Sequence, residues 1–252
     1  MLEITSVSNE KIKDVVRLQQ KKYRNEKGLF LIEGHKPISE AYSENVEIIA
    51  VYTTARHLEK FDFIKDKITL VSDPVMEKIS TTDSMCEAVA VVKQQIQTLD
   101  GIKDAKRIAL IENIKDAGNL GTLIRSASAF AFDAIVLCGD TIDIYNPKVV
   151  RSTVGCMFKI SVVKADLSTV KKHFPQHNFI ATVVNHNDIV NPETIDYSKP
   201  FVVMLGSEAD GLTDTAIELA NIKTTIPMAK NTESLNLSVA GSIIFYISNK
   251  TF

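Results

Sequence analysis

The sequence predicts an α/β protein whose larger part is built on a mostly parallel sheet, preceded by a small α/β domain. Continuous apolar runs such as 108–111, 134–138 and 201–205 are typical of strands that are buried on both faces. Stretches with apolar residues at helical spacing stand between these runs. A regular alternation of strand and helix gives a parallel sheet that helices cover on both sides.

Composition narrows the class of protein. The 252 residues suffice for one large domain or two of ordinary size, and the net charge of −2 means that nucleic-acid binding would need a local basic patch. Three cysteines without a Cys-x-x-Cys pair argue against a disulfide framework or a zinc site. The N-terminus lacks signal-peptide features and no apolar run reaches the ~20 residues that span a bilayer, so we expect a cytoplasmic protein without membrane contact.

The first predicted helix covers residues 9–20, and its continuation to Lys27 is basic. Between residues 11 and 27, seven Lys or Arg against Asp14 and Glu26 give a net charge of +5. This charge fits either a solvated helix face or a patch that binds phosphates. Tyr23, in the middle of the stretch, could stack on a base or serve only in packing.

The rest of the N-terminal third alternates between short strands and helices. Apolar runs predict strands at 29–32, 46–52, 68–71 and 88–92, with helical stretches around 37–44, 55–60 and 74–80. Residues 94–106 are polar and contain Gly101, which favours a boundary there. We therefore predict a domain at 1–95, a linker at 96–106 and a second domain at 107–252.

The second domain begins with a strand at 108–111, and a loop leads from it into a helix with an apolar stripe from Leu120 to Ala131. Arg125 lies off that stripe, two turns or fewer from Asn119, so both side chains can face one crevice at the helix start. A short helix is expected from Tyr145 to Arg151. Further strands are predicted at 134–138, 158–163, 179–184 and 201–205.

Two strands of this domain lead into polar loops. The run 201–205 breaks on Gly206–Gly211, which holds two carboxylates, and the segment 231–240 leads into an apolar, helix-spaced end. In open α/β sheets ligands sit at the carboxyl ends of strands, so we expect the functional site at these loops. Taken singly, the loops also fit structural roles, in which the glycines form turns and the polar residues cap helices.

Several common sites are missing from the sequence. Gly118–Gly121 lacks the Gly-Lys-Ser/Thr ending of a P-loop, and no Gly-x-Gly-x-x-Gly occurs. Glu208 stands where the nucleophile elbow of a hydrolase has serine. The five histidines show no metal-ligand spacing on a helix, so no metal site is expected.

Taken together, three stretches resemble the three motifs of the SpoU/TrmH family of RNA ribose 2′-O-methyltransferases, in the SPOUT superfamily. They are Ile111–Ala127, Met204–Leu212, and Ile226–Met228 with Glu233–Ala240, in the family's order and spacing. Asp143–Ser152 resembles a further stretch common in the family. More loosely, residues 1–93 resemble the family's N-terminal RNA-binding domain, anchored by Leu31–Gly34.

The chain departs from the family pattern at three places. Ala117 stands where proline is usual, Lys36 stands where an arginine is common, and Ser84–Glu87 replaces a Pro-Gln-Gly-like turn. The last two differences bear on the identity of the RNA target more than on activity.

The resemblance implies methylation of a ribose 2′-hydroxyl in RNA, with S-adenosylmethionine as the methyl donor. The cofactor-binding residues that it implies are Leu205, Gly206, Ile226, Met228 and Leu235. The catalytic residues that it implies are Asn119, Arg125, Glu208, Ser234 and Asn236. In this scheme the arginine binds the target phosphate and stabilises the developing alkoxide, the asparagines orient it, the serine assists, and the glutamate braces the loops.

The resemblance also implies a C-terminal trefoil knot and a homodimer with its sites at the interface. Arg151 or a basic N-terminal residue of the second copy could contribute to each site. Ribosomal RNA is the first expected target and transfer RNA the second. Three other functions stay open: a catalytically inactive RNA-binding SPOUT protein, a SPOUT enzyme that methylates a base nitrogen or a protein, and an unrelated nucleotide-binding α/β enzyme.

Overall fold

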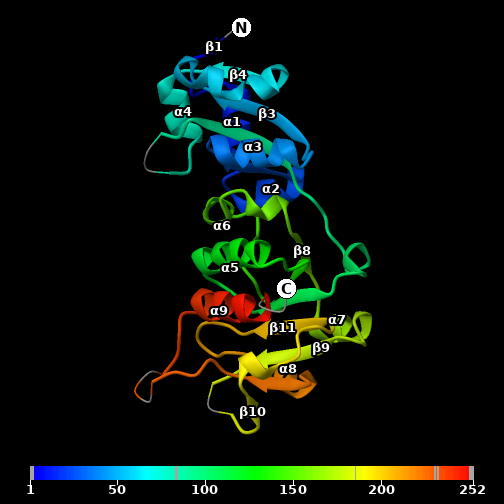
Figure 1. Cartoon of the computed structure of the whole chain (residues 1–252). Coiled ribbons are helices and arrows are strands. Elements are labelled where there is room, and N and C mark those ends of the chain that lie inside the picture. Colours follow the sequence, from blue (N-terminus) through cyan, green and yellow to red (C-terminus); the bar gives the residue numbers. More distant parts are fainter. Residues whose placement is uncertain (1–2, 83–84, 185, 230, 232, 250–252) are drawn as a thin grey trace. The chain divides into compact units, whose positions relative to one another are not determined.

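The computed structural model describes residues 3–82, 85–184, 186–229, 231 and 233–249, and the chain divides into two compact units (Figure 1). The N-terminal unit comprises Met1–Gln95 and Asp143–Lys159. The C-terminal unit comprises Ile96–Ile142 and Ile160–Phe252. The segment Asp143–Lys159 therefore packs with residues that precede it by half the chain, which nothing in the local sequence indicates. The domain boundaries expected from the sequence stay a prediction.

The N-terminal unit holds a five-stranded mixed sheet in the order β1-β4-β3-β5-β2. β5 runs antiparallel to β2 and β3, and the other neighbours are parallel. In chain order the elements are β1 (Glu3–Ile4), α1 (Glu10–Arg17), α2 (Lys21–Lys27), β2 (Leu29–Glu33), α3 (His35–Ser43), β3 (Ile48–Thr53), the 3-10 stretch η1 (Ala55–Lys67), β4 (Ile68–Val71), α4 (Asp73–Ile79), β5 (Ala88–Lys93), α6 (Pro147–Thr153) and η3 (Cys156–Phe158).

The long basic helix expected at the start is two helices. Asn9 caps α1 by accepting a hydrogen bond from the Lys11 amide, and α1 ends at Arg17. Gly28, in the left-handed conformation, ends α2. Arg24 does not belong to a solvated basic face, because its side chain is only 2% exposed and forms an ion pair with Asp143.

The sheet of the N-terminal unit has a core on each face. Ile12 and Val15 of α1 pack with Met76 of α4 on one face. Phe30 packs with Val150 of α6 on the other face, where the Phe30 ring lies 4.5 Å from that of Tyr145. The segment 143–159 thus completes an apolar layer that residues 1–95 alone would leave open.

The C-terminal unit confirms the predicted parallel α/β sheet. Its seven strands follow the order β10-β12-β9-β11-β6-β7-β8, and every neighbouring pair is parallel. In chain order the elements are η2 (Asp100–Ile102), β6 (Arg107–Glu112), α5 (Ala117–Ala129), β7 (Ala134–Cys138), β8 (Ser161–Lys164), α7 (Leu167–His173), β9 (Asn178–Thr182), β10 (Ile189–Val190), η4 (Pro192–Thr194), β11 (Phe201–Leu205), α8 (Asp214–Leu219), β12 (Ile222–Thr224) and α9 (Leu237–Asn249).

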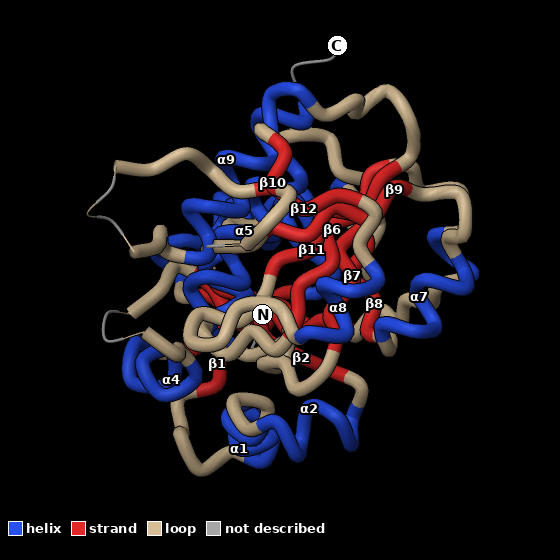
Figure 2. The backbone as a smooth tube through the Cα atoms, turned by 90° about the horizontal axis from the view of Figure 1, so that it is seen from below, coloured by secondary structure: helices blue, strands red, loops and turns tan. Residues whose placement is uncertain are grey.

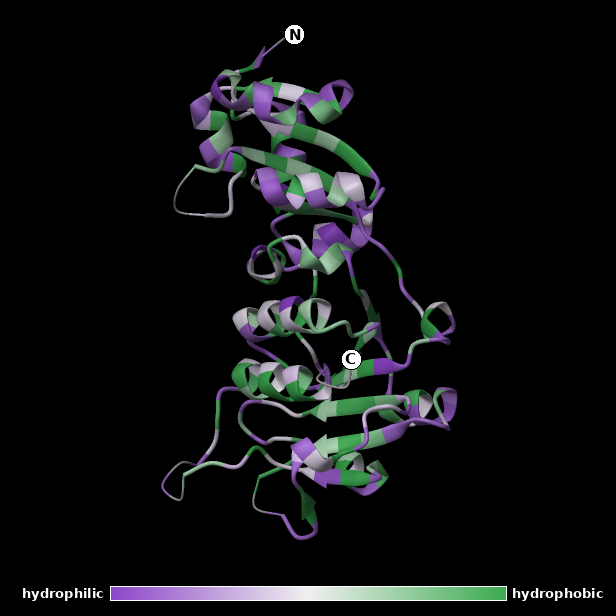
Figure 3. Ribbon diagram, viewed as in Figure 1, coloured by the Kyte–Doolittle hydropathy of each residue, from purple (hydrophilic) through white to green (hydrophobic). Residues whose placement is uncertain are grey.

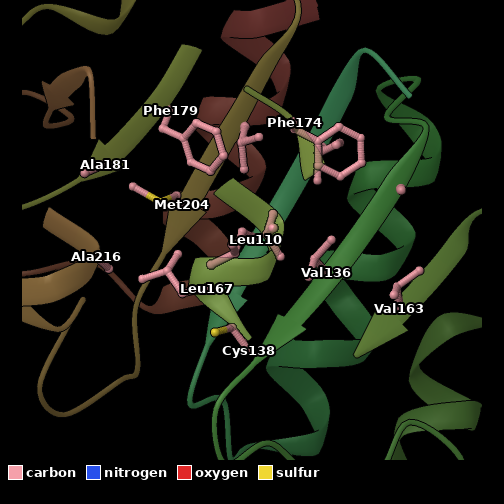
Figure 4. Packing of buried hydrophobic residues seen from close by; sticks show 14 of the residues in the cluster. Leu110, Val136, Cys138, Val163, Leu167, Phe174, Phe179, Ala181, Met204 and Ala216 are labelled. Atoms are coloured by element: carbon pink, nitrogen blue, oxygen red, sulfur yellow. The ribbon is translucent and has the colours of Figure 1, made fainter. Parts of the chain in front are cut away.

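Helices cover both faces of this sheet. Figure 2 shows α5 and α9 on one side of the central strands and α7 on the other. All five residues of β11 are buried, and the strand is green in the hydropathy view of Figure 3, as expected of a strand without a solvent face. On the α7 face, Leu110, Val136 and Met204 pack with Leu167 (Figure 4).

On the opposite face α5 and α9 approach each other closely. A Cβ atom built on Gly241 of α9 would lie 2.4 Å from Cδ2 of Leu123 in α5 and 2.9 Å from Cδ1 of Leu205 in β11. Glycine is therefore the residue that lets α9 reach both elements. The strand expected at 158–163 starts later, at Ser161, because Phe158 belongs to η3 and packs in the N-terminal unit. No helix in the described part of the chain has the length and hydropathy needed to cross a bilayer.

Candidate active site

The parallel register brings the ends of several strands to one edge of the sheet. β11 pairs with β6 so that Leu205 lies opposite Ile111, and β9 pairs with β12 so that Thr182 lies opposite Thr224. The loops that follow these strands therefore start side by side. This is the edge at which ligands bind in open α/β sheets.

A chain of amide hydrogen bonds ties three of these regions together. Asn119 at the start of α5 donates through Nδ2 to Oε1 of Glu208, at 3.0 Å. Asn236 donates through Nδ2 to Oδ1 of Asn119, also at 3.0 Å. Residues from three widely separated stretches of the sequence thus meet, as the resemblance implied.

Both asparagines are held by their own backbone surroundings. Asp116 caps α5 by accepting a hydrogen bond from the Asn119 amide at 2.7 Å, and the Asn119 side chain is 9% exposed. Oδ1 of Asn236 accepts from the amide and the hydroxyl of Ser238, at 3.0 and 2.7 Å, at the start of α9. For Asn236, capping and site formation are therefore not alternatives, because its side chain does both.

The loop after β11 has a fixed shape. A Cβ atom on Gly206 would lie 1.9 Å from the carbonyl carbon of Gly211, so no other residue fits there. Ser207 and Gly211 exchange backbone hydrogen bonds, and Gly211 has φ of +70°. The main chain at Gly206 therefore carries no side chain and has a fixed conformation, so a ligand can approach it closely.

Glu112 holds the far end of this loop and was not among the residues chosen from the sequence. Its carboxylate is 6% exposed and accepts from the amide and the hydroxyl of Thr213, at 2.8 and 2.9 Å. A carboxylate that ends an otherwise apolar strand was the signal available in the sequence. Buried charges are retained where hydrogen bonds satisfy them, so this contact fixes the loop to β6.

A cavity of about 540 Å³ lies at this edge, and a smaller hollow of about 90 Å³ shares part of its wall. Leu205 and Gly206 border the larger space, Ile226 and Met228 border the smaller one, and Leu235 borders both. All five predicted cofactor-binding residues therefore lie around two adjoining spaces. The larger volume is typical of a small-molecule site.

The lining chemistry suits a cationic, partly apolar ligand. Glu208, Asp210 and Glu233 supply carboxylates to the larger cavity, and leucine and isoleucine side chains supply its apolar walls. Ile226 and Met228 are apolar residues of the smaller space. Thr182 also borders both spaces, and its hydroxyl donates to the carbonyl of Met204 at 2.8 Å.

The five predicted catalytic residues differ in their position relative to the two cavities. Glu208, Ser234 and Asn236 line the larger cavity, and Asn119 reaches it through its hydrogen bonds. Arg125 borders neither space. It is exposed on α5, about 9 Å along the helix axis from Asn119, and no hydrogen bond or ion pair joins its guanidinium to another described residue.

Two other chemistries find no support among the residues that the structure describes. Within the described ranges, no group of three His, Cys, Asp or Glu side chains could hold a metal ion. Burial raises the pKa of the Cys138 thiol at the end of β7, and burial raises that of Cys86 to about 11. Both thiols are protonated at neutral pH, unlike a nucleophilic cysteine.

Comparisons with known proteins agree with this geometry. Residues 106–246 match the SpoU rRNA Methylase family, and residues 9–90 match the MRM3-like substrate binding domain. The 23S rRNA (guanosine(2553)-2′-O)-methyltransferase RlmP of Bacillus subtilis is 29% identical over 98% of this chain and 98% of its own length. The 23S rRNA (uridine(2479)-2′-O)-methyltransferase of Streptomyces viridochromogenes is 27% identical over 88% of this chain and 83% of its own.

Solved structures show the same fold along the whole chain. The AdoMet-bound rRNA methyltransferase of Sinorhizobium meliloti superposes with a TM-score of 0.89 at 28% identity, covering 100% of this chain and 98% of that one. A crystal structure described as an RNA 2′-O ribose methyltransferase gives a TM-score of 0.83 at 28% identity, covering 98% of each chain.

Proposed function

The chain belongs to the SpoU rRNA methylase family, and from that premise we propose that it methylates a ribose 2′-hydroxyl of ribosomal RNA with S-adenosylmethionine as the donor. The observation that carries this proposal is the hydrogen-bonded chain Glu208–Asn119–Asn236 beside a cavity of about 540 Å³. The relatives named for 23S rRNA support ribosomal RNA as the target.

The residues around the two adjoining spaces fit the methyl donor. S-adenosylmethionine supplies an electrophilic methyl group on a sulfonium. The bare main chain at Gly206 would accept the adenosine closely, and Leu205 with Leu235 would exclude water from it. Ile226 and Met228 would line the narrow end, and the carboxylates of the larger cavity would favour the positive charge.

The asparagine chain would organise the site rather than touch the methyl group. Both polar atoms of the Asn119 side chain are already engaged, one with Glu208 and one with Asn236. Asn119 would therefore hold two loops at a fixed separation while Ser234 offers a hydroxyl to the cavity. A fixed separation positions the ribose oxygen in line with the methyl group, and alignment of that kind is a major source of rate enhancement.

Arg125 would bind the target phosphate and stabilise the developing alkoxide. Its five N–H donors are not engaged by any described residue, and a guanidinium stays protonated at every working pH, which favours electrostatic stabilisation over a role as base. Because Arg125 borders neither cavity of its own chain, it would act on the site of a second copy.

An exposed apolar groove on α5 and α9 supports that homodimer. The groove encloses about 350 Å³, and Val239 and Tyr246 on its rim are 48% and 52% exposed. An apolar surface of this kind is usually covered by a partner. The trefoil knot completes the proposal on the strength of the family resemblance. A cytoplasmic location is proposed from the cysteine usage and N-terminal sequence, and the relatives named for rRNA are consistent with it.

Methyl transfer to purified RNA tests the function. The full chain is mixed with radiolabelled S-adenosylmethionine and, separately, with unmodified transcripts of 23S rRNA, 16S rRNA and a tRNA pool. Nucleoside mass spectrometry then identifies the modified atom. We expect a 2′-O-methylated nucleoside from 23S rRNA. A methylated base would indicate another SPOUT branch, label in tRNA would change the substrate, and absence of S-adenosylmethionine binding by calorimetry would favour an inactive RNA-binding protein.

A further inference from the structure

The N-terminal unit has a cavity of its own, of about 410 Å³. α1 and α2 form its walls, and β2, β3 and β5 form its floor. Leu29, Ala50 and Val91 give the floor an apolar surface. The cavity is therefore a partly covered sheet face with room for a flat organic group.

Tyr52 of β3 borders this cavity, and no described residue engages its hydroxyl. The side chain is 6% exposed, and no hydrogen bond joins its oxygen to any residue that the structure describes. The oxygen is not among the enclosed polar atoms that lack a partner, so it meets solvent where Tyr52 lines the cavity. A buried tyrosine usually finds a hydrogen-bond partner, and here the partner would be a ligand.

Tyr23 of α2 borders the cavity and lies near two cations. Cζ of Arg17 lies 6.0 Å and Nζ of Lys22 lies 5.8 Å from the centre of its ring. The ring is half-buried, so it is held in place while part of it borders the cavity. A fixed aromatic ring beside cations is the arrangement on which unpaired bases stack in single-stranded RNA recognition.

The charges around the opening separate into paired and unpaired groups. Arg17 is tied to Asp14 at 2.8 Å and Lys27 lies 3.8 Å from Glu26. Lys11, Lys21 and Lys22 form no ion pair with any described residue. Lys11 borders the cavity, and Lys21 and Lys22 belong to the first turn of α2 next to Tyr23, so these cations remain for phosphates. The Asp14 carboxylate, which also borders the cavity, can accept hydrogen bonds from a ligand.

We infer that this cavity receives an unstacked nucleobase of the RNA substrate, an inference that rests on the proposed function. The base stacks on Tyr23, the Tyr52 hydroxyl and the Asp14 carboxylate meet its polar edge, and the free lysines contact the flanking phosphates. The match of this part of the chain to a substrate binding domain gives the domain a general role, and the cavity gives it a specific contact with one nucleotide.

Binding of an unmodified 23S rRNA transcript to the full chain tests the inference. Tyr23→Leu removes the stacking surface and weakens binding about tenfold. Tyr52→Phe removes one hydroxyl and weakens binding about threefold. Tyr42→Leu is the matched control, because Tyr42 is an exposed tyrosine of the same unit that does not line the cavity. Ultraviolet cross-linking with mass spectrometry locates nucleotide adducts, which we expect on Tyr23 or Tyr52.

Two outcomes overturn the inference: equal affinity of Tyr23→Leu, Tyr52→Phe and wild type, or adducts confined to peptides that exclude both tyrosines. Calorimetry with S-adenosylmethionine separates this failure from failure of the proposed function. If the wild-type protein binds and methylates RNA and both variants bind RNA with the same affinity, only the inference about the cavity is refuted. If the wild-type protein binds RNA through the cavity but transfers no methyl group, only the proposed enzymatic function is refuted. If the wild-type protein binds no RNA, both the inference about the cavity and the proposed function are refuted.

Discussion

Two arginines in helices of this chain meet opposite surroundings. Arg24 in α2 is buried and donates to Asp143 Oδ2 at 2.6 and 3.2 Å and to the carbonyls of Leu18 and Gln19 at 3.0 and 2.8 Å. Arg125 in α5 is exposed, with no donor engaged by a described residue. A guanidinium whose donors are engaged stabilises the fold, whereas one whose donors are free on an exposed helix face is available to a substrate.

Arg24→Met gives the largest expected effect, on stability. It removes the guanidinium donors from Asp143 Oδ2 and from two backbone carbonyls, so that the carboxylate keeps only the Tyr145 amide, on Oδ1. Removing one partner of a buried ion pair costs about 3–5 kcal/mol. Urea unfolding measures the loss. The double variant Arg24→Met with Asp143→Leu should recover a large part of it, because no charge is then left unpaired. A loss below about 1 kcal/mol would show that the pair is dispensable.

Arg125→Ala should act on catalysis instead. Removing a group that stabilises charge in the transition state lowers kcat roughly 100- to 1000-fold. The free energy of unfolding and the affinity for S-adenosylmethionine should stay at wild-type values, because Arg125 contacts neither the core nor the cavities. Arg56→Ala, at another exposed arginine, is the matched control. Wild-type turnover of Arg125→Ala would remove the proposed role.

Mixing tests whether Arg125 serves the site of another copy. An equimolar mixture of Arg125→Ala and Asn236→Ala chains contains hybrid dimers with one intact composite site. Exchanging dimers should therefore regain up to about a quarter of wild-type activity, while each variant alone is inactive. Light scattering checks that dimers form. Absence of complementation in exchanging dimers would mean that Arg125 serves its own chain.

Glu112→Gln extends the comparison from arginines to carboxylates. Of these variants it should have the smallest effect on stability and on the function of the site. The buried Glu112 accepts twice from Thr213, and the amide retains one acceptor. We expect a loss of about 1–2 kcal/mol in stability and a several-fold weaker affinity for S-adenosylmethionine, because the Gly206 loop loosens. Glu218→Gln, exposed on α8, is the control for the change of charge. If calorimetry gives the same affinity for S-adenosylmethionine in Glu112→Gln and Glu218→Gln, Glu112 has no influence on the cofactor site.

Local pattern was sufficient for much of the fold. The runs 108–111, 134–138 and 201–205 are strands because continuous apolarity leaves no solvent face, and the parallel order follows from the helices between them. Pattern could not reveal the burial of Arg24 or the late start of the strand at Ser161. Both depend on residues 143–159 packing against a distant part of the chain.

The site shows a similar division. The resemblance brought Asn119, Glu208 and Asn236 to attention, and the structure joins them by hydrogen bonds. Their catalytic roles stay predictions. Glu112 escaped notice because its importance lies in a contact with Thr213, about a hundred positions later, which no spacing rule encodes.

The interleaved path of the chain has a consequence for biosynthesis. Residues 1–95 leave the ribosome before Asp143 has been synthesised. During this interval the guanidinium of Arg24 has no ion-pair partner at position 143. The early unit cannot reach its final stability until Lys159 has emerged, by which time β6 and β7 are also present. Truncations that stop before residue 143 should consequently yield an aggregation-prone fragment, and both units mature together late in translation.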